Sequence, residues 1–168
     1  MSIDSRKKAP EIMGIAVRAE MDAAAIYRGL LGRVKNEVLR QKLDFLAKEE
    51  DRHKVLLERL FRDRYPGRIL RVPETARPAK GVPSVESMAV VDLFKLAMGK
   101  EKEAEEYYRE AGVRIEDPAA KKMLGYLSRV ERSHYFMLKS EIGLIQAFPD
   151  SYDVEEAHFG QDLFHIGG

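Results

Sequence analysis

Four long stretches of the chain repeat apolar residues every three or four positions, which is the spacing of an amphipathic helix. They cover approximately residues 9–33, 36–64, 87–114 and 117–147. No stretch alternates apolar and polar residues as a half-buried strand would. At the start of the fourth stretch, Asp117 and Pro118 provide an N-cap and a first-turn proline. The pattern therefore predicts an all-α protein with four long helices.

The links between these helices predict how the helices are arranged. The links near 33–36 and 114–117 are short, so each joins two antiparallel neighbours. The middle link, about 65–86, holds four of the seven prolines and is long enough to run from one end of a bundle to the other. We therefore predict a four-helix bundle over residues 1–148, made of two antiparallel hairpins joined by a long crossover. Residues 149–168 are predicted to form an irregular C-terminal tail.

The chain contains an internal repeat with an offset of 81 residues, at which 20–57 aligns with 101–138 without a gap. In each half a Glu within the apolar stripe, Glu20 or Glu101, is followed 30 residues later by a second Glu that begins the motif Glu-x-x-His. These residues interrupt the apolar stripes, so the repeat predicts a polar cluster inside the bundle. The matched polar pairs are Glu20 and Glu101, Glu50 and Glu131, His53 and His134, and Tyr27 and Tyr108.

The chemistry of this cluster points to metal. A carboxylate buried in an apolar bundle is costly unless it is paired, protonated or bound to a cation. Glu and His three positions apart share one helix face, so six groups converge on a place that two divalent cations can occupy. Four carboxylates and two imidazoles suit iron or manganese better than zinc. We expect Glu50 and Glu131 to bridge the two metals, Glu20 and Glu101 to be terminal carboxylates, and His53 and His134 to be terminal nitrogen ligands.

Tyr27 and Tyr108 lie two helical turns beyond the first Glu of each half. A buried tyrosine hydroxyl needs a hydrogen-bond partner, and a ligand carboxylate is the nearest candidate. The two residues could equally be core tyrosines without a chemical role.

Composition excludes several classes of protein. The sequence has no cysteine, so it holds no disulfide, thiol nucleophile, iron–sulfur cluster or rubredoxin-type iron centre. A net charge of +1 argues against a general nucleic-acid binder. Residues 1–8 lack the apolar core of a signal peptide, and no apolar run approaches the roughly 18 residues of a membrane span. A cytoplasmic protein without membrane contact is expected.

The ordered motifs resemble those of the ferritin-like diiron proteins and, within them, the rubrerythrin group. The motifs that carry the resemblance are Ala19-Glu20 with Tyr27, Glu49 to His53, Glu101 to Ala104 with Tyr108, and Glu131 to His134. The resemblance covers about residues 9–147 and implies a ferritin-like bundle with two iron ions, with manganese as a possible metal and zinc as an inactive substitute. Classical rubrerythrins also carry a C-terminal rubredoxin domain, which this sequence lacks, and a second Glu where this chain has Ala104.

The resemblance implies an oxidoreductase that reduces hydrogen peroxide or O2 with electrons from an external donor, such as a rubredoxin-like protein. Two alternatives stay open: a ferroxidase that stores or detoxifies iron, and a bundle that binds metal without catalysis. A homodimer is expected, because small bundles with apolar faces commonly pair with twofold symmetry.

The crossover and its approach are locally basic. This segment is either a solvated loop or a docking patch for an acidic electron carrier. Its cationic residues are Arg62, Arg64, Arg68, Arg71, Arg77 and Lys80.

Overall fold

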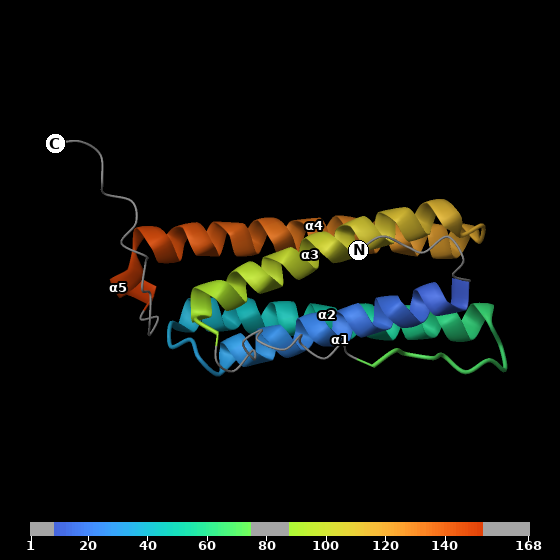
Figure 1. The fold of residues 1–168 in the computed structure, drawn as a ribbon, viewed down its shortest axis with the longest axis horizontal. Helices are drawn as coiled ribbons and strands as arrows, with labels where there is room; N and C mark the ends of the chain where they lie inside the picture. Colours follow the sequence, from blue (N-terminus) through green and yellow to red (C-terminus); the bar gives the residue numbers. More distant parts are fainter. Residues whose placement is uncertain (1–8, 75–87, 153–168) are drawn as a thin grey trace.

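The computed structural model of the protein describes residues 9–74 and 88–152, and four long helices form the bundle (Figure 1). No strand occurs within these two ranges. The predicted all-α four-helix bundle is confirmed, with each helix beginning and ending within a few residues of the expected position. The helices are α1 (Ala9–Leu31), α2 (Glu37–Arg64), α3 (Val90–Arg114) and α4 (Pro118–Ala147).

The ends of two helices are fixed by residues that the sequence supplies for this purpose. The Asn36 side chain accepts a hydrogen bond from the backbone N–H of Leu39 at 3.0 Å, and Asp117 accepts one from Ala120 at 2.8 Å. Both caps satisfy N–H groups that have no partner within the helix. Pro118 follows Asp117 in the first turn of α4, as the sequence predicts. The two caps thus fix where α2 and α4 begin, directly after the short links in which the chain reverses direction.

The helices pair as two antiparallel hairpins, α1 with α2 and α3 with α4, and α1 also packs against α3 (Figure 1). The crossover leaves the end of α2 and runs back beside α1 as far as residue 74. Residues 75–87, which include Arg77 and Lys80, lie outside the described residues. One long crossover between two hairpins is the ferritin-like topology.

Beyond α4, the helical turn α5 (Pro149–Tyr152) replaces the irregular start that the sequence predicts for the tail. The rest of the tail, residues 153–168, lies outside the described residues. Among the helices described here, none is both long and apolar enough to cross a membrane.

Two apolar layers fill the bundle, one toward each end. Leu57 lies in the first layer, whereas its repeat counterpart Leu138 lies in the second. Conversely, Leu43 lies in the second layer and its repeat counterpart Leu124 lies in the first. Matched residues thus fall at opposite ends, because the two hairpins are related by an approximate twofold axis through the middle of the bundle. Each buried leucine of this kind contributes about 1.5–3 kcal/mol by leaving water.

The described part of the crossover is held against α1 by a very close approach. The Arg18 side chain donates a hydrogen bond through Nε to the backbone carbonyl of Pro73 at 2.7 Å. A Cβ atom added to Gly14 would lie 2.0 Å from the carbonyl oxygen of Arg71. Because that oxygen belongs to the backbone, a side chain at position 14 would force the crossover away from the helix.

We predict that Gly14→Ala destabilises the protein by about 1–3 kcal/mol, the usual cost of overpacking a tight contact. Gly99→Ala is the matched control, since no atom lies within 4 Å of a Cβ added at this position in α3. The control should stabilise the protein by about 0.5–1 kcal/mol through helix propensity. Urea unfolding of both variants measures the difference, and equal stability of the Gly14 variant and the unchanged protein would contradict the close packing.

Candidate metal centre

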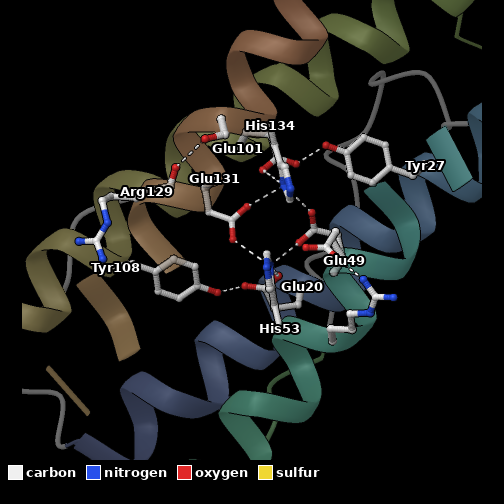
Figure 2. Close-up of polar contacts among 12 residues, drawn as sticks. Glu20, Tyr27, Glu49, His53, Glu101, Tyr108, Arg129, Glu131 and His134 are labelled. Carbon is white, nitrogen blue, oxygen red and sulfur yellow. Dashed lines mark hydrogen bonds and ion pairs between the residues drawn. The ribbon is translucent and has the colours of Figure 1, made fainter. Parts of the chain in front are cut away.

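The six repeated polar residues lie together between the two apolar layers, and Figure 2 shows how five of them, all except Glu50, are arranged. The six side chains converge from all four long helices, and none of these residues is more than 3% exposed. Such burial follows from the sequence, because each residue takes a position within an apolar stripe. Glu20 comes from α1, Glu50 and His53 from α2, Glu101 from α3, and Glu131 and His134 from α4.

The six residues form two groups of four that share Glu50 and Glu131. In the first group, Nδ1 of His53 lies 3.1 Å from Glu131 Oε1 and 3.4 Å from the nearest oxygens of both Glu20 and Glu50. Within each group the candidate ligand atoms lie within 4.8 Å of one another. The shared carboxylates of Glu50 and Glu131 therefore lie between two equivalent candidate metal positions.

The second group repeats the first around His134. Its Nδ1 lies 3.0 Å from Glu50 Oε1, 3.3 Å from Glu131 Oε2 and 3.6 Å from Glu101 Oε2. The rings of His53 and His134 are stacked, with centroids 5.7 Å apart and planes inclined by 16°. The approximate twofold axis of the bundle therefore passes through the cluster.

Several polar atoms of the cluster are buried without a hydrogen bond. They are Glu50 Oε1, both carboxylate oxygens of Glu131, both ring nitrogens of His53 and Nδ1 of His134. Unpartnered buried polar atoms are costly and uncommon in folded proteins. A cation held between them would satisfy these lone pairs, and four carboxylates with two imidazoles are a donor set suited to iron or manganese. The residues present therefore fit a pair of metal ions.

The electrostatics of the cluster separate its carboxylates into two kinds. Burial raises the pKa of Glu20 and Glu101 well above the usual range. Burial acts in the same direction on Glu50 and Glu131, but the nearby histidines outweigh it and lower the pKa of both. Burial disfavours the charged imidazole, yet the carboxylates around it raise the pKa of each histidine to about 12. Without metal, two imidazolium rings thus balance two ionised carboxylates.

The two repeated tyrosines cross between the hairpins (Figure 2). The Tyr27 hydroxyl donates a hydrogen bond to Glu101 Oε1, and the Tyr108 hydroxyl donates one to Glu20 Oε1. Each tyrosine therefore contacts the carboxylate of the opposite half, not the Glu that precedes it on its own helix. Burial and the neighbouring Glu101 raise the pKa of Tyr27, which keeps this hydroxyl a donor.

One buried carboxylate of α4 was not singled out by the sequence analysis. Glu141 is 4% exposed and accepts a hydrogen bond from Nζ of Lys42 on α2. It lies three positions after Leu138 in the apolar stripe of α4, and this spacing could have revealed its burial. Its repeat counterpart is Leu60, so Glu141 belongs to no repeated pattern and lies outside both groups of candidate ligands.

A sequence-family model described as Rubrerythrin matches residues 11–142. Among solved structures, a hypothetical protein from Pyrococcus furiosus is similar, with a TM-score of 0.72 and 29% identity. The alignment covers 84% of this chain and 92% of that one. No curated protein sequence matches the chain.

Two further solved structures share the fold at low identity. One is CopM in a Cu(II)-bound form, with a TM-score of 0.66 and 10% identity over 81% of this chain and 96% of that one. The other is a bacterioferritin from Rhodobacter capsulatus, with a TM-score of 0.65 and 20% identity over 90% of this chain and 93% of that one. At these identities the likeness concerns the fold alone.

We predict that Tyr27→Phe and Tyr108→Phe each weaken metal binding by about 10–100-fold, because groups that orient a ligand contribute on this scale. Tyr107→Phe is the matched control, since its hydroxyl donates to the backbone carbonyl of Ile12 at 2.8 Å and contacts no ligand carboxylate. The control should lower stability without changing metal affinity. Competition titrations with a chelator measure the affinities, and an equal loss in all three variants would contradict the assigned role.

We also predict that metal binding releases protons and strengthens as pH rises. Both imidazoles have a raised pKa of about 12 in the metal-free cluster and must lose a proton to bind a metal. Filling the site should therefore release about two protons from the histidines, with more from Glu20 and Glu101. Titration with Co(II) in weakly buffered indicator solution between pH 6 and 8 counts these protons. Affinity independent of pH would contradict the charge arrangement.

Proposed function

The chain belongs to the rubrerythrin family of ferritin-like diiron proteins, and from this premise we propose that it reduces hydrogen peroxide to water at a diiron centre. An external electron-carrier protein would supply the electrons. The balanced reaction consumes one peroxide, two electrons and two protons and yields two water molecules. O2 is the second candidate oxidant.

The sharing of Glu50 and Glu131 between the two groups of ligands is the observation that carries this proposal. A single-metal site would need one group, and two independent sites would share no residue. Glu20 and His53 would complete one iron site, and Glu101 and His134 the other. Two irons held in this way supply two electrons at one place, which is what cleavage of a peroxide O–O bond requires.

The surrounding residues of the chain would prepare this chemistry. Apolar layers on both sides exclude bulk water from the cluster, which strengthens the electrostatic interactions inside it. The hydroxyls of Tyr27 and Tyr108 hold the two terminal carboxylates in fixed orientations. Only small molecules suit so enclosed a site, and peroxide and O2 meet that condition.

A ferroxidase is the second candidate function, and Ala104 favours it. At this position classical rubrerythrins carry a further Glu, whereas Ala104 is partly buried against the first apolar layer. The remaining ligand set is symmetric, with one terminal carboxylate and one imidazole for each metal. At a centre held by such a set, O2 or peroxide would oxidise incoming Fe(II) without a carboxylate that changes position with redox state.

Stopped-flow oxidation of the Fe(II)-loaded protein should separate the two functions. We predict that hydrogen peroxide oxidises the protein at least about tenfold faster than O2, a difference of roughly 1.4 kcal/mol in activation free energy. Glu131→Gln should abolish the reaction by removing a shared carboxylate. Glu141→Gln, on the same helix but outside the cluster, should leave it intact. Faster oxidation by O2 with accumulation of ferric mineral would favour the ferroxidase, and oxidation no faster than that of free iron would contradict both functions.

A further inference from the structure

The solvent-facing side of α4 carries only positive charge. This helix exposes five cationic side chains, whereas its two carboxylates, Glu131 and Glu141, are only 1% and 4% exposed. The whole sequence has a net charge of just +1, so the excess is local. The exposed cations are Lys121, Lys122, Arg129, Arg132 and Lys139, and we refer to the surface they share as the α4 face.

The internal repeat shows that the bundle does not require this charge pattern. Helix α2 is the counterpart of α4 and carries carboxylates on its outer side. Asp51 corresponds to Arg132 and Glu58 to Lys139, so two positions have the opposite charge in α4. Among the carboxylates of α2, only Glu50 has a carboxylate at the matching position of α4, and this residue is Glu131 inside the cluster. The fold therefore accepts acidic residues at these positions, and the α4 face lacks them for another reason.

The cations of the two helices also differ in their partners. On α2, Lys48 pairs with Asp44 at 2.5 Å, and Arg52 pairs with Glu49. Within the described part of the chain, no carboxylate lies within ion-pair distance of any of the five cations of the α4 face. Exposed cations without an ion-pair partner can steer a partner of opposite charge.

Aromatic side chains lie among these charges. Tyr126 is 45% exposed and Phe136 is 52% exposed, on the same helix as the five cations. The guanidinium carbon of Arg132 lies 5.8 Å from the centroid of the Phe136 ring. Exposed aromatic residues together with arginine are typical of the centres of protein–protein interfaces. Tyr126 has an exposed aromatic counterpart on α2, Phe45, so Phe136, whose counterpart is Val55, is the exposed ring that distinguishes the α4 face.

We propose that the α4 face is the docking surface for a small acidic electron-carrier protein. The inference rests on the proposed function, because the carrier would supply the electrons for peroxide reduction. Glu131 and His134 lie on the inner side of the same helix, so one helix diameter, about 10–12 Å, separates the docked carrier from the metal centre. Two successive encounters would each transfer one electron from a reduced carrier, which together supply the two electrons that reduction of one peroxide consumes, and the oxidised carrier would leave each time.

Other occupants suit the α4 face less well. A second copy that paired through the same face about a twofold axis would bring two cationic surfaces together, which like-charge repulsion opposes. A nucleic acid would be expected to bind a protein with a marked basic excess, and this chain has almost none. The location of the face on the helix that holds Glu131 and His134 favours a redox partner, since a carrier docked there lies near the metals.

Binding of a redox-inert carrier tests the docking surface without using the metal centre. The probe is gallium-substituted acidic rubredoxin, titrated into the full chain by calorimetry at low ionic strength. We expect measurable binding that weakens steeply with added salt, as electrostatic docking does. Absence of binding, or tighter binding of duplex DNA or of anionic phosphatidylglycerol vesicles under the same conditions, would overturn the proposal.

The matched variants compare the α4 face with the basic crossover. The double substitution Arg132→Asp and Lys139→Glu gives α4 the residue types that α2 carries at the corresponding positions. It should weaken binding of the gallium-substituted rubredoxin at least tenfold. Arg62→Glu with Arg68→Glu makes the same change of charge at exposed positions beside the crossover and should change binding less than twofold. An equal or larger loss in the crossover variant would overturn the assignment to the α4 face.

Kinetics with native reduced rubredoxin separate this inference from the proposed function. Reduction of the ferric protein by rubredoxin should slow at least tenfold in the α4 variant, while reduction by dithionite, which needs no docking, should be unchanged. If rubredoxin reduced the α4 variant and the unchanged protein at equal rates, the assignment of the docking surface would be overturned. Failure of dithionite to reduce the metal centre would count against the proposed function, and the gallium titration would still decide where the carrier binds.

Discussion

The structure depends on one electrostatic constraint: four carboxylates and two imidazoles are buried together where water cannot solvate them. Unpaired charges in such a place would cost several kcal/mol each. Without metal, protonation of the histidines and of Glu20 and Glu101 balances the cluster. With two divalent ions, four ionised carboxylates balance four positive charges. The apolar layers above and below make this balance necessary, and the tyrosines stabilise the ionised form by donating hydrogen bonds.

The repeat explains how so short a chain builds two matching groups of candidate metal ligands. Each half supplies one Glu and one Glu-x-x-His, but neither half can surround a metal alone. Each group of ligands contains residues of both hairpins, since Glu131 joins the group around His53 and Glu50 joins the group around His134. Binding of metal by these groups would therefore be coupled to pairing of the hairpins, and Tyr27 and Tyr108 donate hydrogen bonds across the same interface.

The two halves agree inside the bundle and differ on its surface. Glu50 and Glu131 match, whereas the outer residues Asp51 and Arg132 carry opposite charges. Packing and metal ligation constrain the interior of both halves equally. The surface is constrained by whatever each helix meets in solution, and the cationic outer side of α4 is where we propose a contact that α2 does not make.

The periodicity of the sequence determined the four helices, and Asp117 with Pro118 indicated where the fourth begins, because these signals are local. The offset of 81 residues also identified the candidate ligands, since the six polar residues occupy apolar stripes in both halves. Only the tertiary structure decided that Tyr27 contacts Glu101, because that contact depends on how the hairpins cross. The burial of Glu141 beside Lys42 and the approach of Arg71 to Gly14 likewise depend on distances between segments that helical periodicity does not encode.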